Sequence, residues 1–74
     1  MAQKVRIVYC APCGYLPEAR DLQVEIEKKI PGADVELEEG DRGIFDVFAG
    51  KSLIFSRYKE MRFPETSEIL QKLK

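Results

Sequence analysis

Both cysteines of this 74-residue chain lie in one short segment, Cys10-Ala11-Pro12-Cys13. Two thiols at this spacing can form a disulfide with each other and exchange it with other thiols. The loop that such a disulfide closes is too short to remove much entropy from the unfolded chain, so the bond adds little as a structural cross-link. We therefore expect dithiol–disulfide exchange, with Cys10 and Cys13 as the catalytic pair.

The pair lies between two segments of different periodicity. Before it, Val5-Arg6-Ile7-Val8-Tyr9 is β-branched and aromatic, which predicts a strand. After it, the segment from Pro17 to about Ile30 repeats apolar residues at helical spacing, which predicts an amphipathic helix. A CxxC pair between a strand and a helix, in a chain whose first residues do not look like a secretory signal, is typical of a thioredoxin-like redox motif.

Composition argues against several classes of function. With 12 basic and 13 acidic residues and a net charge of −1, the chain lacks the basic face of a nucleic-acid-binding protein. Its apolar stretches are far shorter than the ~20 residues of a membrane-spanning helix, so no membrane contact is expected. The absence of histidine excludes Cys–His catalytic pairs. We expect a cytoplasmic protein without a bound cofactor or metal, whose partners are protein or small-molecule thiols and disulfides.

The rest of the chain predicts a single domain over residues 1–74. A chain of this length buries only roughly 60% of its unfolded surface, so both helices must pack against the sheet. Alternating polarity, a short Gly-containing turn and a proline at a helix start identify the remaining elements. In order, these are strand 34–38, strand 44–48, strand 52–56, a charged loop over 57–63, and a helix from Pro64 whose apolar face is Ile69, Leu70 and Leu73.

This order, β-α-β-β-β-α, predicts an α/β fold of the two-layer α+β kind, with both helices on one face of a mixed four-stranded sheet. The first two strands should be parallel and the hairpin antiparallel. Period-two parity assigns the helix-facing residues as Val5, Ile7, Tyr9, Val35, Leu37, Phe45, Val47, Leu53 and Phe55. On the opposite face it predicts an apolar patch, here called the partner face, of Val8, Ile44, Phe48 and Ile54.

The segment Tyr9-Cys10-Ala11-Pro12-Cys13-Gly14-Tyr15-Leu16-Pro17 resembles the selenoprotein W-like (SelT/SelW/SelH, or Rdx) family in a cysteine-containing form. Pro31-Gly32, Gly43-Ile44-Phe45-Asp46-Val47 and Arg62-Phe63-Pro64 support the resemblance, which runs nearly end to end. It implies a thioredoxin-like fold and a thiol–disulfide oxidoreductase of cell redox homeostasis, with glutathione as co-substrate. Selenoprotein members carry selenocysteine at the position of Cys13, so sulfur there implies a slower nucleophile.

Two arguments indicate Cys13 as the attacking sulfur and Cys10 as the resolving one. The first is the selenocysteine position that the resemblance implies. The second is Pro17, which is tolerated only in the first helical turn, so that the helix begins between Gly14 and Pro17. If Gly14 opens the helix, Cys13 is its N-cap, where free N–H groups and the helix dipole lower the pKa of a thiol.

Several neighbours are expected to support the pair. Pro12 stiffens the turn, while Gly14 and Pro17 set the start of the helix. Tyr15 is close enough in sequence to hydrogen-bond a thiolate, although packing is the commoner role of such a tyrosine. In thioredoxin-like folds the loop before the third strand faces the dithiol, so Gly43-Ile44 is predicted to face the substrate, with glycine allowing another chain to approach closely.

Two other functions stay open at this stage. The first is a zinc site, for which one CxxC supplies only two of four ligands, so that carboxylates or a second subunit would have to complete it. The second is a binding module in which the partner face docks another protein, or a second copy of the chain as a homodimer, under control of the thiols. Scattered exposed apolar residues are the ordinary alternative to such a patch.

Overall fold

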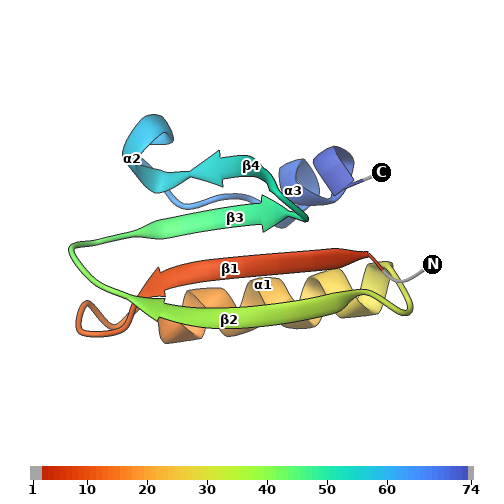
Figure 1. The fold of residues 1–74 in the computed structure, drawn as a ribbon, viewed down its shortest axis with the longest axis horizontal. Helices are drawn as coiled ribbons and strands as arrows, with labels where there is room; N and C mark the ends of the chain where they lie inside the picture. Colours follow the sequence, from red (N-terminus) through yellow and green to blue (C-terminus); the bar gives the residue numbers. More distant parts are fainter. Residues whose placement is uncertain (1–2, 74) are drawn as a thin grey trace.

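The structure, a computed structural model, describes residues 3–73 of the chain. Its elements are β1 (Lys4–Cys10), α1 (Leu16–Lys29), β2 (Asp34–Gly40), β3 (Phe45–Ala49), β4 (Ser52–Ser56), α2 (Arg57–Glu60) and α3 (Thr66–Leu73) (Figure 1). The predicted order is confirmed with one correction. The segment predicted to be a loop over 57–63 begins with the short helix α2, which ends where Met61 adopts a left-handed conformation with φ of 60°.

The four strands form one mixed sheet in the order β2-β1-β3-β4. As predicted, β1 and β2 are parallel, and β3 and β4 form an antiparallel hairpin. The antiparallel neighbour of β1 is β3, so β1 is a central strand with partners on both sides. β2 lies at an edge, where its exposed Glu36 and Glu38 discourage pairing with other chains.

Helices α1 and α3 cover the same face of the sheet, as predicted. Figure 1 shows α1 behind β1 and β2 and α3 behind the β3–β4 side of the sheet, and α3 also packs against α1. The helix stripe of Ala19, Leu22 and Ile26 is buried against the inward-facing strand residues. The resulting core consists of Val5, Ile7, Tyr9, Ala19, Leu22, Ile26, Val35, Phe45, Val47, Phe55, Ile69 and Leu73.

Parity fails at one place, in β4. Val47 pairs with Phe55 and Phe48 pairs with Leu53, so Ile54 is the extra residue of a β-bulge. The bulge reverses the predicted faces of Leu53 and Ile54. Leu53, predicted to face the helices, shares the face of Phe48 and is 43% exposed. Ile54, predicted on the partner face, is half-buried and packs against the core.

The rest of the partner face is less exposed than parity suggested. Val8 is buried, and its side chain meets that of Ile44 over Gly40, where an added Cβ would lie 2.7 Å from Ile44 Cγ2. Half-buried Phe48 lies beneath the guanidinium of Arg6, whose Cζ is 4.5 Å from the ring centroid. The sheet therefore partly covers this face with its own side chains, and docking of a second copy there stays a prediction.

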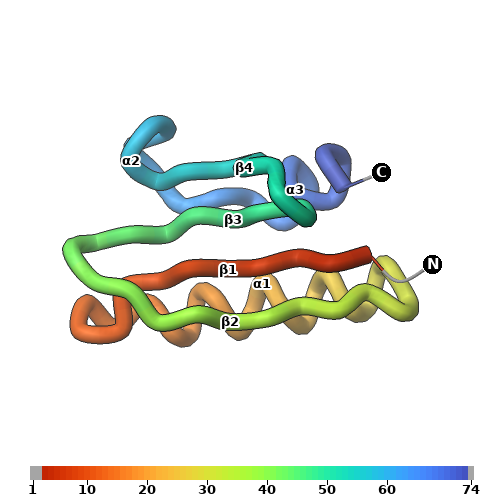
Figure 2. The backbone as a smooth tube through the Cα atoms, in the orientation of Figure 1, coloured from red at the N-terminus to blue at the C-terminus, as the bar shows by residue number. Residues whose placement is uncertain are grey.

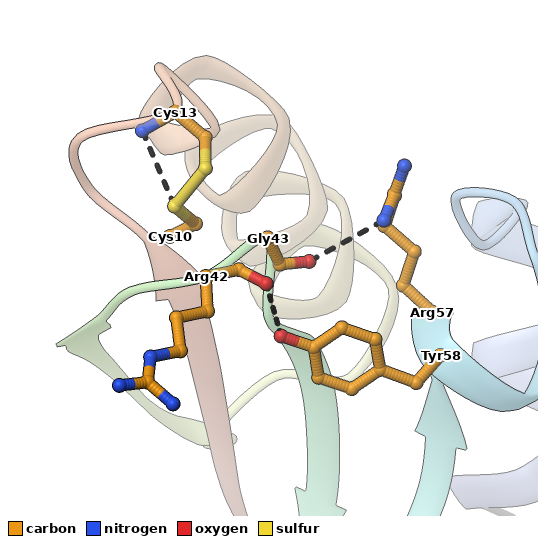
Figure 3. Close-up of a disulfide and its surroundings, with 6 residues drawn as sticks. All are labelled: Cys10, Cys13, Arg42, Gly43, Arg57 and Tyr58. Atoms are coloured by element: carbon orange, nitrogen blue, oxygen red, sulfur yellow. Dashed lines mark hydrogen bonds between the residues drawn. A yellow bond between two sulfur atoms is a disulfide. The ribbon is translucent and has the colours of Figure 1, made fainter.

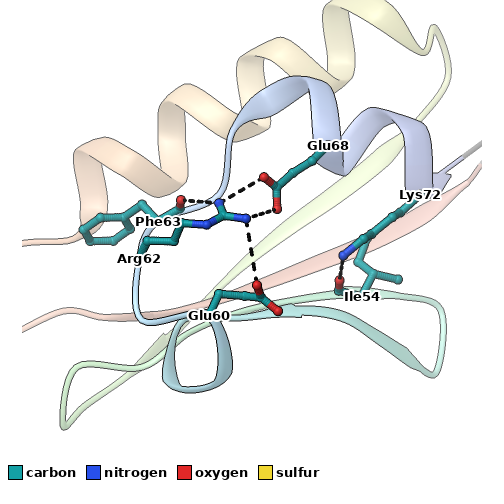
Figure 4. Close-up of polar contacts among 6 residues, drawn as sticks. All are labelled: Ile54, Glu60, Arg62, Phe63, Glu68 and Lys72. Atoms are coloured by element: carbon teal, nitrogen blue, oxygen red, sulfur yellow. Dashed lines mark hydrogen bonds and ion pairs between the residues drawn. The ribbon is translucent and has the colours of Figure 1, made fainter.

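The connection between α2 and α3 is held by one arginine. Arg62 Nη1 lies 3.0 Å from Glu68 Oε2 and Nη2 lies 3.9 Å from Glu60 Oε1 (Figure 4). The hydrogen bond from Arg62 is the main reason that the pKa of Glu68 falls below its ordinary value of 4.5. At the other end of α3, Lys72 Nζ donates to the carbonyl of Ile54 at 2.8 Å.

The lowered pKa of Glu68 predicts a pH-dependent contribution to stability. A carboxyl with a lower pKa in the folded state stabilises the fold above its unfolded pKa and loses that contribution as pH falls through the folded pKa. Glu68→Gln should therefore lower the free energy of unfolding slightly at pH 7 and make no difference well below pH 4.5. Denaturant unfolding at several pH values measures this. Glu27→Gln, an exposed change on α1, is the control, and a difference for Glu68→Gln that persists at low pH would contradict the prediction.

The buried stripe of α1 predicts that alanine substitutions on the two sides of this helix lower the free energy of unfolding by different amounts. Ile26 is fully buried, so Ile26→Ala should lower the free energy of unfolding by about 2–5 kcal/mol. Val24 is 55% exposed, so Val24→Ala should change it by no more than about 0.5 kcal/mol. Chemical denaturation measures both, and Ile26→Val serves if Ile26→Ala does not fold. Equal losses for the two alanine variants would show that this face of α1 does not carry the core.

Candidate redox site

The two cysteines form a disulfide at the carboxyl end of β1. The Cα atoms of Cys10 and Cys13 lie 5.2 Å apart, within the usual range for disulfides (Figure 3). Cys10 is the last residue of β1, and Cys13 lies in the turn that follows. The redox pair predicted from the sequence is thus held at the junction of a central strand and a helix.

The two sulfur-bearing residues differ in exposure. Cys10 is fully buried, because it ends a central strand, whereas Cys13 is exposed in the turn. The backbone N–H of Cys13 donates to Cys10 Sγ at 3.2 Å. Cys13 is therefore the more accessible residue of the pair, while the sulfur of Cys10 accepts a backbone hydrogen bond.

The start of α1 differs from the prediction that made Cys13 its N-cap. α1 begins at Leu16, with Tyr15 as N-cap and Pro17 in the first turn. Gly14 has φ of +81°, a left-handed value that cannot open a helix, and its N–H bonds to the carbonyl of Ala11 at 3.1 Å to close a tight turn. The N-cap hypothesis for Cys13 is therefore wrong, and exposure is the property that distinguishes the two cysteines.

The predicted supporting residues surround this turn. Pro12 is exposed within it, and Gly14 supplies the left-handed conformation that a residue with a side chain rarely adopts. Tyr15 is half-buried, and its ring packs edge-on against Phe63 with centroids 4.9 Å apart. The structure thus gives Tyr15 a packing role, because its ring lies against Phe63.

The connection between β2 and β3 lies beside the disulfide. The backbone N–H of Cys10 donates to the carbonyl of Ile44 at 2.8 Å, and that of Ala11 donates to the carbonyl of Gly40 at 3.2 Å. Gly43 has φ of +78° and, with Ile44, forms the part of the connection nearest β3. Figure 2 shows the dithiol turn and this connection at the same end of the molecule. The structure thus places Gly43 and Ile44 next to the cysteine-bearing strand.

Helix α2 brings two further residues to this end of the molecule. Arg57 Nη1 donates to the carbonyl of Gly43 at 3.5 Å, and the hydroxyl of Tyr58 donates to the carbonyl of Arg42 (Figure 3). Both residues fall in the segment predicted from the sequence to be a charged loop, and no local pattern marks their side chains. Their role depends on a contact between segments about 14 residues apart, which periodicity does not report.

The guanidinium of Arg57 is held among aromatic rings. Its Cζ lies 5.5 Å from the centroids of both Tyr15 and Phe63. Phe63 in turn packs edge-on against Phe45 of the core at 5.3 Å. Cation–π contacts of this kind fix the position of an arginine that lacks a carboxylate partner. The site therefore has a positioned cation that the sequence analysis missed.

A groove lies elsewhere, at the end of the open sheet face opposite the disulfide. It has a volume of about 580 Å³ and is lined by Lys4, Val5, Arg6, Asp34, Glu36, Phe48, Gly50 and Lys51. It contains neither cysteine, so the groove and the disulfide are separate features. Within residues 3–73, three or more His, Cys, Asp or Glu side chains nowhere gather closely enough to hold a metal ion. None of the helices in the described part of the chain has the length and apolarity needed to cross a bilayer.

Comparison with known proteins identifies the family. The sequence profile of the Rdx family matches residues 4–74. This chain belongs to the Rdx family. The resemblance carried by the Tyr9–Pro17 motif is thereby confirmed, and a CxxC pair within disulfide distance agrees with a redox-related, thioredoxin-like family.

Relatives within this Rdx group match almost the whole chain. Selenoprotein W of Gallus gallus is 33% identical over 76 residues, covering 99% of this chain and 89% of that protein. Migration and invasion enhancer 1 of Bos taurus is 29% identical over 72 residues, and the match spans 95% of this chain but only 63% of that protein. The crystal structure of a selenoprotein W-related protein from Vibrio cholerae has a TM-score of 0.93 at 24% identity, covering 99% of this chain and 94% of that one. This last likeness confirms the predicted fold.

The difference in exposure predicts different reactivities of the two reduced cysteines. In the native reduced protein, Cys13 should react with iodoacetamide at least about tenfold faster than Cys10, because only Cys13 is exposed. Peptide mass spectrometry after timed quenching measures both rates, and in 6–8 M urea the rates should converge. Faster native labelling of Cys10 would reverse the assignment of the accessible sulfur.

Proposed function

We propose that this Rdx-family protein is a thiol–disulfide oxidoreductase in which Cys13 exchanges with the substrate and Cys10 is the resolving partner. The observation that carries the proposal is the asymmetry of the pair. One sulfur-bearing residue is exposed, the other is fully buried, and the buried sulfur accepts an N–H hydrogen bond at 3.2 Å. Family membership supports redox chemistry at this pair.

In the reductive direction the disulfide accepts two electrons in two exchange steps. A substrate thiolate attacks the sulfur of Cys13, the Cys10–Cys13 bond breaks, and a mixed disulfide forms on Cys13. Cys10 leaves as a thiolate, stabilised by the N–H of Cys13, and takes a proton from solvent. A second substrate thiolate then attacks the mixed disulfide, so that an oxidised substrate disulfide departs and Cys13 is left as a thiol. The reverse sequence reduces a disulfide substrate.

The connection over Gly43-Ile44 is the proposed contact surface for the substrate. It lies against the cysteine-bearing strand, because the carbonyl of Ile44 accepts the hydrogen bond of Cys10. Gly43 has no side chain, and its positive φ of 78° is a conformation that glycine adopts readily, so the backbone at this point is open to another chain. Pro12 and Gly14 shape the turn on the other side of the exposed sulfur. A substrate that reaches Cys13 would therefore pass between two backbone segments of fixed shape.

Glutathione is the proposed co-substrate, and the proposed setting is the redox homeostasis of the cytoplasm. The cytosolic thiol pool keeps exposed disulfides in exchange, so a pair with one exposed sulfur is suited to cycle there. No bound cofactor is needed for the exchange, since both electrons pass between sulfur atoms. Protein thiols and disulfides are the alternative substrates on the same chemistry.

An equilibrium titration in glutathione redox buffers tests the proposal. The Cys10–Cys13 pair should show one two-electron transition between about −180 and −270 mV, the range of working oxidoreductases. Alkylation of free thiols followed by mass measurement reports the fraction oxidised. Cys10→Ser is the control: it should lose the intramolecular transition and instead collect a glutathione adduct on Cys13. If the wild-type pair forms no disulfide across this range, the oxidoreductase proposal is wrong.

A further inference from the structure

We infer that Arg57 is a specificity-determining residue that binds a carboxylate of anionic thiol substrates beside the Cys10–Cys13 disulfide. The inference rests on the proposed function and names the class of substrate for the same site. Three observations carry it: the position of the guanidinium, its unfilled hydrogen-bonding capacity, and the charges around it.

Arg57 contacts the connection one peptide before the residue that bonds to Cys10. Its Nη1 donates to the carbonyl of Gly43, while the next carbonyl, that of Ile44, accepts from the backbone N–H of Cys10. Figure 3 shows the guanidinium and the disulfide on either side of Gly43, with the other terminal nitrogen of Arg57 pointing away from that carbonyl. A substrate lying along this connection with its sulfur at Cys13 would have the guanidinium within its reach.

The guanidinium has few partners for a half-buried cation. Of its five N–H donors, one makes a long 3.5 Å contact with a carbonyl, and the buried Nε has no partner among residues 3–73. The ion pairs of the described residues involve Arg6 and Arg62 but not Arg57. A partly desolvated charge without a counter-ion is costly, and the two cation–π contacts offset only part of that cost. The other terminal nitrogen, Nη2, is not buried and makes no hydrogen bond or ion pair among residues 3–73, so a carboxylate from a ligand would bind at the terminal nitrogens and not at the buried Nε.

The charges around Arg57 indicate that an anionic substrate would be held by a direct contact with this arginine and not by the overall field of the protein. The chain has a net charge of −1, and exposed Glu39 and Asp41 lie in or beside the same connection. The overall field therefore does not attract anions to the disulfide. A fixed arginine can still bind a carboxylate through two parallel N–H bonds, and the rings of Tyr15 and Phe63 hold it in place for that geometry. Among cellular thiols, glutathione carries such carboxylates.

The test compares the reduction of the oxidised protein by matched thiols. Glutathione supplies the carboxylates, glutathione diethyl ester masks them, and 2-mercaptoethanol is small and neutral. Arg57→Gln should slow reduction by glutathione about tenfold, the value of one charge-assisted contact. The same variant should leave the rates with the ester and with 2-mercaptoethanol within about twofold of wild type. Arg57→Lys keeps the charge but loses the planar fork. Its rate of reduction by glutathione should lie between those of wild type and of Arg57→Gln.

Lys59→Gln is the matched control, because it removes the same charge from an exposed position of the same helix. It should leave all three rates unchanged. Equal slowing by Lys59→Gln and Arg57→Gln would show that net charge matters and would overturn the inference. Equal slowing of all three thiols by Arg57→Gln would show that Arg57 only supports the connection, and would overturn it too. If no thiol reduces the wild-type disulfide, the proposed function itself is wrong, and the inference fails with it.

Discussion

The pairing of β1 on both sides is the constraint on which the rest of the structure depends. β2 lies parallel to it and β3 antiparallel, so β1 is buried along most of its length. Its last residue is Cys10, and the hydrogen bonds of that strand end extend to Ile44 and Gly40. The same ladder that closes the sheet therefore buries one sulfur and places the β2–β3 connection beside it.

The turn after β1 makes the two cysteines differ in exposure, because it leaves Cys13 exposed while Cys10 is buried at the end of the strand. Gly14 adopts a left-handed conformation, which delays α1 until Leu16 and leaves Cys13 in an exposed turn. The difference between the two sulfurs thus comes from where the strand ends and not from a helix N-terminus. In the proposed exchange, buried Cys10 with its N–H donor is the leaving partner and exposed Cys13 is the residue that is attacked.

The second contribution to the site comes from the far end of the chain. α2 supports the β2–β3 connection through the side chains of Arg57 and Tyr58, which bond successive carbonyls of Gly43 and Arg42. The aromatic rings of Tyr15 and Phe63 pack on the guanidinium, so segments from three parts of the chain meet beside the β2–β3 connection. The open sheet face, in contrast, is partly covered by its own Arg6, and the groove on it lies away from the cysteines.

Local patterns in the sequence determined every element except α2, the parallel crossover, the helix-covered face and the place of the two cysteines between a strand and a helix, because periodicity and turn residues act within a few positions. They could not determine features that depend on longer-range geometry. The bulge at Ile54, which exposes Leu53, depends on how β4 pairs with β3. Pro17 allowed α1 to begin anywhere between Gly14 and Pro17. The left-handed conformation of Gly14 decided that the helix begins at Leu16. The place of Arg57 beside the disulfide was decided only by tertiary structure, because contacts between distant segments leave no periodic signal.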